Sequence, residues 1–500
     1  MNLRKICVYL LLTIFIIFGF YYRLQGISSN HSFWADEGYI ASIARDLAQG
    51  EISLSDLLST AGTFYQLFHV LLLTLSFIAF GATEFAARIL PVAFGTVGIA
   101  VAFAVGKKFS NDFGGLIAAF LVSFSQLEIV YSTQARPYAA LSTIMLSIVY
   151  CIQLLSEKTT GKPKKLLHLC LIILSFSSIF LHASGIFIAI IYPAYLLFSF
   201  KKQIILRLKN PTFSITLVIG FLLLVFAFPQ IYQLPMHFLG KDINNTTYLR
   251  ALFAREYSFI SLPALFGLLL AFNKYRGLVI GLLGWIFLLL IGWNFMQYSH
   301  NIRYLVPFFS ILFIFFAVFW ANVGEKLFQK QSALICLAII AILFIGGNKI
   351  ARKPALYYSP NADLYGDVQN ANYKDAFAFI EKEYPNHKDM VIFNDIIDAQ
   401  RWYLTEKPDA DAYFAKHAVP ARPHVVNNVM EYGTLEEFLK EQSKFESGLL
   451  IVEDWESILP EDIKQYAKEN MKLEYRVESL EVSPTDKWPI EIYSWGMEEK

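Results

Sequence analysis

Twelve apolar stretches, each of about the length that crosses a bilayer, fill the chain from its N-terminus to about Gly347. They are residues 6–22, 64–80, 89–106, 115–131, 137–155, 166–181, 183–200, 212–230, 257–272, 277–294, 304–320 and 332–347. With 56% hydrophobic residues, 17% charged residues and a mean hydropathy of +0.46, the chain is too apolar for a soluble multidomain protein. The pattern predicts a polytopic α-helical membrane protein.

The basic connectors between these stretches indicate which of them span, because positively charged loops stay in the cytoplasm. The connectors are Lys107 with Lys108, and residues 158–165, 201–209, 274–276 and 326–330. If all twelve stretches spanned from a cytoplasmic N-terminus, these connectors would lie outside. If residues 64–80 lie along the outer surface or re-enter, every connector lies inside. We therefore expect a multi-pass plasma (inner) membrane protein with about eleven transmembrane helices, an external juxtamembrane segment and a cytoplasmic N-terminus.

The C-terminal part has a different composition, rich in Asp, Glu and Lys. The predicted division is a transmembrane domain, residues 1–347, and an extracytoplasmic α/β domain, residues 348–500. Its pattern predicts helices at 373–383, 396–404, 435–442 and 461–470, and strands at 390–393 and 449–452. Trp402 and Trp455 could stack on a sugar, although packing in a core is the commoner role of tryptophan.

Two adjacent carboxylates, Asp36 and Glu37, follow the first apolar stretch and its neighbour Trp34. Acidic residues that open a helix, here about 37–49, are ordinary N-terminal caps. A carboxylate beside an aromatic ring at a membrane boundary can also have a tuned pKa and act chemically. The stretch alone leaves both interpretations open.

The predicted topology places further polar residues at the outer ends of the spans. An arginine there is costly if it faces lipid, so it is expected to face a polar cavity or an anion, with snorkelling to the interface as the alternative. His182 could equally be a turn residue between two spans. Because Asp36 lies on the same face, we favour a catalytic role for Asp36 and a helix or loop role for Glu37. The residues on this face are Arg88, Gln134, Arg136, Tyr138, His182, Arg303 and Tyr304.

The external loop 231–256 adds Lys241, Arg250 and Arg255 as candidate contacts to a phosphate head group. Screened surface charge is the alternative interpretation of these three residues.

A carboxylate, several arginines and aromatic residues on the outer face suit the transfer of a group from a lipid phosphate. A departing phosphate needs cations or guanidinium groups to stabilise its developing charge, and a carboxylate can deprotonate the incoming hydroxyl or amine. A donor embedded in the membrane would bring its own activation, and the sequence has no Walker phosphate-binding loop.

Three short motifs resemble those of the GT-C fold glycosyltransferases, and more narrowly the bacterial branch related to protein O-mannosyltransferases and lipid A aminoarabinose transferases. They are Trp34-Ala35-Asp36-Glu37 after the first span, the Gln-x-Arg-x-Tyr core of residues 131–138, and Arg303-Tyr304-Leu305-Val306-Pro307. The resemblance covers residues 1–347.

The resemblance implies inverting transfer of a sugar from a polyprenyl-phosphate donor on the extracytoplasmic face. The acceptor would be a glycan, a lipid or a protein, and no nucleic acid is involved. By position, Asp36 resembles the catalytic base or acceptor-orienting acid, with Glu37 as its motif partner. Arg136 and Tyr138 fall in the second external loop that lines the cavity of the family, and Arg303 resembles a basic residue near the donor phosphate.

Two departures from the family pattern affect these assignments. Residues 60–65, Thr-Ala-Gly-Thr-Phe-Tyr, lack the lysine that often contacts the donor phosphate, so Arg88 or Arg303 is expected to replace it. Gln134-Ala135-Arg136 stands where some relatives place an acid. This leaves Asp36 as the single expected catalytic carboxylate and weakens the case for a bound divalent metal, which prefers several oxygen ligands. The lipid-linked sugar phosphate is then a co-substrate, and no cofactor is expected.

Two other classes of function fit a chain with many spans. One is a transporter or flippase of a lipid-linked glycan, which would use polar residues at mid-membrane depth or inverted repeats. The other is a membrane scaffold with an outer binding domain. Replacement of Asp36 distinguishes the transferase from both.

Overall fold

The computed structural model describes residues 3–25, 27, 32–59, 64–157, 162–201, 219, 252–253, 257–289, 302–327, 332–347, 349–354, 371–387, 390–394, 397–404, 411–414, 422–423, 430–453, 459–479 and 489–497. The chain divides into two compact units. The first comprises residues 1–25, 50–355 and 362–365, and the second comprises residues 26–49, 356–361 and 366–500. Segment 26–49, which contains Asp36 and Glu37, therefore belongs to the same unit as the C-terminal part of the chain.

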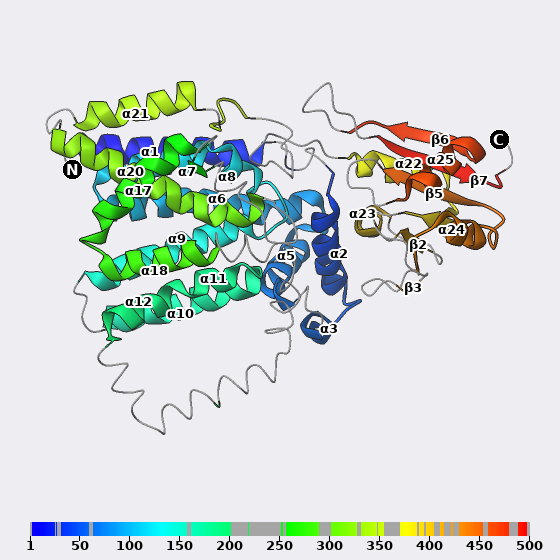
Figure 1. Ribbon diagram of the computed structural model, residues 1–500, viewed down its shortest axis with the longest axis horizontal. Coiled ribbons are helices and arrows are strands. Elements are labelled where there is room, and N and C mark those ends of the chain that lie inside the picture. Colours follow the sequence, from blue (N-terminus) through cyan, green and yellow to red (C-terminus); the bar gives the residue numbers. More distant parts are fainter. Residues whose placement is uncertain are drawn as a thin grey trace. The chain divides into compact units, whose positions relative to one another are not determined.

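The first unit is helical. Its elements are α1 (Leu3–Leu24), α3 (Leu54–Ser59), α5 (Leu67–Phe80), α6 (Glu84–Phe109), α7 (Asp112–Phe124), α8 (Gln126–Val130), α9 (Tyr138–Ser156), α10 (Lys162–Leu181), α11 (Gly185–Ala189), α12 (Ile191–Ser199), α17 (Ser258–Phe272), α18 (Arg276–Phe287), the 3-10 helix η2 (Ile302–Leu305), α20 (Val306–Leu327) and α21 (Ser332–Gly346). Figure 1 shows the long helices packed side by side.

Five helices in the described part of the chain are long and apolar enough to cross a membrane. They are Leu3–Leu24, Glu84–Phe109, Tyr138–Ser156, Lys162–Leu181 and Arg303–Leu327, and six shorter apolar helices accompany them. The prediction of a membrane protein is confirmed, whereas the expected eleven spans and the cytoplasmic N-terminus stay predictions. The external position expected for residues 64–80, now largely α5, also stays a prediction.

Small residues let α6 and α7 approach closely. A Cβ on Gly106 would lie 2.8 Å from the carbonyl oxygen of Gly114, and one on Gly115 would lie 2.7 Å from that of Phe103. Side-chain caps start both helices: Thr83 accepts from the Ala86 N–H, and Asn111 accepts from the N–H groups of the first turn of α7. Such backbone contact is typical of helix packing in membranes.

The second unit combines α2 (Ala35–Gln49) with a mixed sheet and four further helices. They are α22 (Tyr373–Glu383), β1 (Val391–Phe393), α23 (Ile397–Tyr403), β2 (Asp411–Phe414), β3 (Arg422–Pro423), β4 (Met430–Tyr432), α24 (Leu435–Gln442), β5 (Gly448–Glu453), α25 (Glu461–Asn470), β6 (Lys472–Val477) and β7 (Ile490–Trp495). The strand order is β3-β4-β2-β1-β5-β7-β6. Strands β4, β2, β1 and β5 run parallel, and the other pairings are antiparallel.

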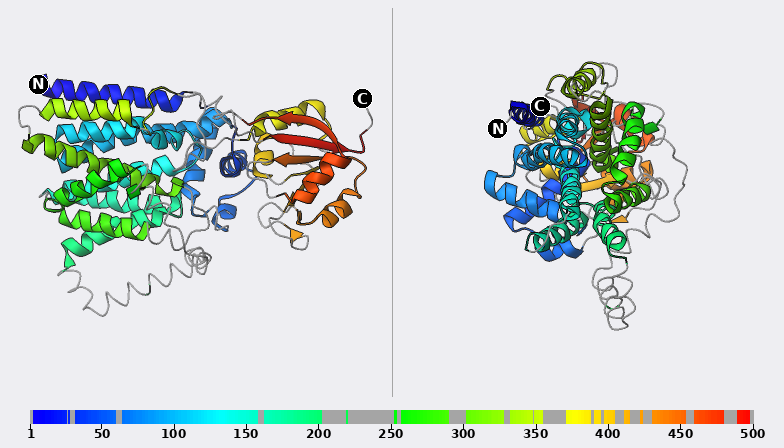
Figure 2. Two further views of the ribbon diagram at one scale, coloured as in Figure 1. Left: turned by 45° about the horizontal axis from the view of Figure 1, so that its top comes forward. Right: turned by 90° about the vertical axis from the view of Figure 1, so that its left-hand side faces the viewer.

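Helices cover both faces of this sheet (Figure 2). Alternate strand residues face opposite sides. Ile392, Leu449 and Ile451 therefore pack with α22 and α23 on one face. Phe393 and Leu450 pack with α24 and α25 on the other. The helices predicted at 373–383, 435–442 and 461–470 are present with those bounds, and the two predicted strands are β1 and β5.

The two tryptophans singled out in the sequence have different outcomes. Trp402 lies on α23 with 9% of its surface exposed, and its ring is 4.9 Å from that of Phe33. Packing within the second unit therefore accounts for Trp402. Trp455 lies outside the described residues.

Candidate active site

The candidate residues are distributed over both units. Asp36 and Glu37 lie on α2 in the second unit. The candidates in the first unit are Arg88, Gln134, Arg136, Tyr138, His182, Arg303 and Tyr304. Lys241, Arg250 and Arg255 lie outside the described residues, so their head-group role stays a prediction.

An aromatic cluster brings together three distant segments of the first unit. Tyr138, the first residue of α9, has its ring centroid 5.4 Å from that of Tyr131 and 5.4 Å from that of His182. Tyr304, in η2, lies 6.4 Å from Tyr138 and 5.8 Å from His182. We call these four residues the aromatic cluster. Three of its members were candidates from sequence, and the structure places them together.

Two arginines flank the aromatic cluster. The Arg136 guanidinium lies 5.7 Å from the Tyr138 ring centroid, and that of Arg303 lies 5.2 Å from the Tyr304 ring. Arg303 Nη2 also donates to Tyr304 Oη at 3.3 Å. Arginine on an aromatic face keeps its planar fork of donors, which suits a phosphate. The cluster therefore gathers two guanidinium groups beside aromatic rings, of which Tyr131, Tyr138 and His182 are buried and Tyr304 is partly exposed.

The segment between α8 and α9 is fixed by one hydrogen bond from α5 and by one within the segment. His69 on α5 donates from Nε2 to the carbonyl oxygen of Ala135 at 3.0 Å. Within the segment, the Arg136 N–H donates to the Gln134 carbonyl at 2.7 Å, and the Gln134 side chain is buried. Gln134 and Arg136 are thus set in a fixed turn immediately before Tyr138.

His182 is oriented by its own turn. Nδ1 accepts from the Ser184 N–H at 3.1 Å and lies 2.9 Å from the Ser184 hydroxyl. A ring nitrogen that accepts cannot carry a proton, so the neutral imidazole has its hydrogen on Nε2. His182 therefore has a structural turn contact on one edge and aromatic neighbours, Tyr138 and Tyr304, around its ring.

Arg88 is buried near the start of α6, 3.8 Å from Glu84 one turn earlier. A fully buried guanidinium does not reach the surface, so the snorkelling alternative does not describe Arg88. The contact with Glu84 gives it a counter-ion within its own helix.

The two carboxylates of α2 differ in exposure. Both lie in the first turn, where the helix dipole favours negative charge, and the Gly38 N–H donates to the Trp34 carbonyl at 2.9 Å. The Glu37 side chain is fully buried, whereas Asp36 is partly exposed. The roles expected for Asp36 in the reaction and for Glu37 in structure stay predictions.

Solved structures supply the comparison that decides the fold. No protein-family model matches the sequence, and no curated protein matches it significantly. The structure of ArnT, a lipid A aminoarabinose transferase, from Cupriavidus metallidurans in the apo state aligns over 99% of this chain and 98% of its own, with a TM-score of 0.59 and 13% identity. The same enzyme bound to undecaprenyl phosphate aligns over 97% of each chain, with a TM-score of 0.57 and 13% identity. The archaeal oligosaccharyltransferase AglB from Archaeoglobus fulgidus, in complex with an inhibitory peptide and a dolichol-phosphate, aligns over 90% of this chain and 70% of its own, with a TM-score of 0.53 and 12% identity.

The protein has the GT-C fold. The resemblance inferred from three short motifs is confirmed at the level of the fold, and the match to ArnT extends over both units of the chain.

Sequence reasoning missed two buried ionisable residues within the GT-C fold, Arg23 and Glu128. Arg23, at the end of α1, donates to the carbonyl oxygens of Gly19, Val122 and Ser123 at 3.0, 2.7 and 3.0 Å. It also donates to the Ser132 hydroxyl at 3.1 Å.

Glu128 lies on α8 and accepts from the Ser310 hydroxyl of α20. Arg23 and Glu128 therefore fix the segment that leads to Arg136 and Tyr138 onto α1 and α20. Glu128 stands as a lone acid in an apolar stretch, which was a usable signal, because ionisable residues at such places are rarely incidental.

We expect Arg23→Met to destabilise the protein by about 3 kcal/mol, because three buried carbonyls lose a charged donor. Thermal unfolding in detergent should show the loss as a lower midpoint. Arg352→Met is the matched control, since Arg352 is exposed and also donates to two carbonyls, those of Phe344 and Gly347. Equal midpoints for Arg23→Met and the native protein would show that the Arg23 network does not support the fold.

The described residues also line a partly open, largely apolar cavity of about 250 Å³ in the first unit. Helices α17, α20 and α21 line it, together with Ser125 and Lys349. None of the candidate site residues lines this cavity. Among the described residues, no group of three or more His, Cys, Asp or Glu side chains is placed to hold a metal ion.

Proposed function

We propose that the protein transfers a sugar from a polyprenyl-phosphate-linked donor to an acceptor on the extracytoplasmic face of the membrane, with inversion. The observation that carries the proposal is the aromatic cluster with Arg136 and Arg303, assembled from separate segments of a GT-C fold. The structural neighbours support the donor class, because ArnT was solved with undecaprenyl phosphate and AglB with a dolichol-phosphate.

The proposed reaction is a single displacement. The acceptor hydroxyl or amine attacks the anomeric carbon as Asp36 takes its proton, and the bond from that carbon to the phosphate oxygen breaks. The polyprenyl phosphate leaves with both electrons of that bond. Attack from the face opposite the leaving group inverts the configuration at the anomeric carbon.

The roles of the other candidates follow from their chemistry. Arg303 and Arg136 stabilise the negative charge that grows on the departing phosphate. Tyr138, His182 and Tyr304 offer aromatic faces to the sugar, and Gln134 supports the turn that carries Arg136. Arg88 is a second candidate for the phosphate, and Glu37 supports the first turn of α2. We propose no metal in this reaction, since guanidinium groups supply the positive charge.

The full-length protein in liposomes tests the proposal directly. We expect it to consume an undecaprenyl-phosphate-linked sugar and release undecaprenyl phosphate when envelope extract supplies the acceptor. Deletion of the gene should remove one sugar from one envelope polymer, which would name the acceptor class. Unchanged donor levels with every extract fraction would contradict the proposed donor class.

A further inference from the structure

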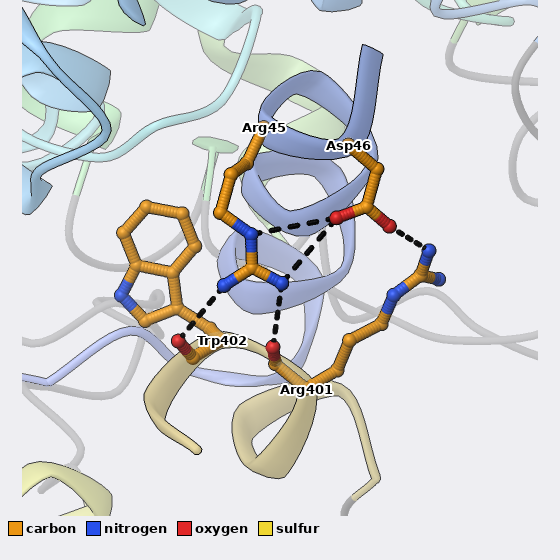
Figure 3. A network of polar contacts seen from close by, with 4 residues as sticks. All are labelled: Arg45, Asp46, Arg401 and Trp402. Atoms are coloured by element: carbon orange, nitrogen blue, oxygen red, sulfur yellow. Dashed lines mark hydrogen bonds and ion pairs between the residues drawn. The ribbon is translucent and has the colours of Figure 1, made fainter. Parts of the chain in front are cut away.

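Helix α2 is attached to the C-terminal part of its unit at both of its ends. Near its C-terminal end, Arg45 donates to the main-chain carbonyls of Trp402 and Arg401 at 3.2 and 2.9 Å (Figure 3). Its neighbour Asp46 accepts from the Arg401 guanidinium and lies 3.3 Å from that of Arg45. We call Arg45, Asp46 and Arg401 the clamp.

The clamp is a buried arrangement rather than a surface ion pair. Asp46 has 2% of its surface exposed, and both guanidiniums share its carboxylate. Arg401 and Trp402 lie in the last turn of α23, where carbonyls lack partners within the helix and carry the negative end of its dipole. Arg45 therefore caps α23 from α2, so each helix depends on the other.

A second attachment lies just before α2. The Phe33 N–H donates to the Tyr403 hydroxyl at 2.6 Å, and the Phe33 ring packs on Trp402. The Ser32 hydroxyl accepts from the Lys374 N–H at 3.2 Å, at the start of α22. The chain is thus fixed to α22 and α23 within four residues of Asp36.

This part of the second unit ends at Gln49, and the chain continues at Gly50. Gly50 has a φ of +77°, a backbone conformation that favours glycine. No other described part of the chain packs against it, because a Cβ built on Gly50 would have no neighbour within 4 Å. By contrast, α2 is a continuous helix of 15 residues. Asp46 lies ten positions after Asp36, which corresponds to about 15 Å along a continuous helix. A change at the clamp is therefore transmitted along α2 to Asp36.

We propose that Arg45, Asp46 and Arg401 are positioning residues: the C-terminal domain holds the helix that carries Asp36 and thereby sets the orientation of that carboxylate during transfer. This inference rests on the proposed function of Asp36. It assigns the C-terminal domain a role in the reaction that needs no ligand site of its own.

Arg401→Gln tests the clamp. Glutamine keeps a hydrogen-bond donor but lacks the positive charge that pairs with the Asp46 carboxylate. We expect amide hydrogen exchange of residues 35–49 to rise at least tenfold and kcat for transfer to fall at least tenfold. The donor Kd and the KM for donor should change less than twofold. Arg401→Lys, which restores the charge, should recover part of kcat.

Arg476→Gln is the matched control, since Arg476 pairs with Glu491 and Glu478 in the same unit. It should change neither the exchange of α2 nor kcat. Tyr403→Phe, which removes the acceptor of the Phe33 N–H, replaces Arg401→Gln if that variant does not fold, and the same two effects are expected.

The outcomes separate this inference from the proposed function. If Arg401→Gln speeds amide exchange in α2 but leaves kcat unchanged, the positioning role is wrong. If the variant leaves amide exchange in α2 unchanged, the clamp does not hold the helix and the positioning role is also wrong. If the native protein transfers no sugar, the proposed function fails, while the exchange data still report whether the clamp holds α2.

Discussion

Asp36→Asn should lower kcat for sugar transfer by at least about 100-fold, because a positioned general base typically contributes 10²–10⁴ in rate. Asparagine has the size of aspartate but cannot take the proton of the acceptor. Binding of undecaprenyl phosphate should stay within twofold, since the phosphate is assigned to the arginines. The measurement is release of undecaprenyl phosphate by the purified variant in liposomes.

Glu51→Gln is the control for this prediction. Glu51 is an exposed carboxylate two residues after α2, so its replacement removes the same charge without touching the first turn of the helix. The control should transfer at the native rate. Native kcat in Asp36→Asn would show that Asp36 is a helix cap and that another group takes the proton.

Arg303→Ala should raise the Kd for undecaprenyl phosphate by about 10- to 100-fold, since a hydrogen bond to a charged group contributes 1.5–3 kcal/mol. Tyr304 keeps its ring, so the loss reports the guanidinium rather than the aromatic cluster. Arg303→Lys should recover only part of the affinity, because lysine lacks the planar fork of donors. Equilibrium binding in detergent or nanodiscs gives the three constants.

Arg276→Ala provides the comparison for Arg303. Arg276 opens α18 and lies 5.4 Å from the Phe272 ring, so it is another arginine stacked on an aromatic side chain. The topology predicted from the basic connectors assigns it to the cytoplasmic side. Equal loss of affinity in both variants would mean that donor binding depends on overall positive charge and not on Arg303.

The sequence predicted those elements whose signal is local. Helices α22, α24 and α25 have strong amphipathic patterns, and their bounds agree with the structure. The edge strand β6 was missed although its sequence, Lys-Leu-Glu-Tyr-Arg-Val, alternates polar and apolar residues, which is the pattern of a strand. The grouping of Tyr138, His182 and Tyr304 was also predictable, because the positive-inside rule placed them at the same ends of their helices.

The contacts that the sequence could not predict join residues far apart in the chain. Arg401 and Asp46 are 355 positions apart, and Arg23 and Ser132 are 109 apart. Neither pairing leaves a periodic pattern, and from the sequence Asp46 resembles an ordinary surface charge near the C-terminal end of α2. The assignment of α2 to the C-terminal unit follows from these contacts and not from any boundary in composition.

The fate of the donor lipid in proteoliposomes tests the central claim most directly. The donor would carry one label on its sugar and another on its polyprenyl chain, with acceptor extract on one side of the bilayer. The proposed function predicts that the two labels separate: the sugar moves to the acceptor, and polyprenyl phosphate stays in the membrane. If the two labels instead cross the bilayer together with the sugar–phosphate bond intact, the protein is a transporter of the lipid-linked sugar and not a transferase.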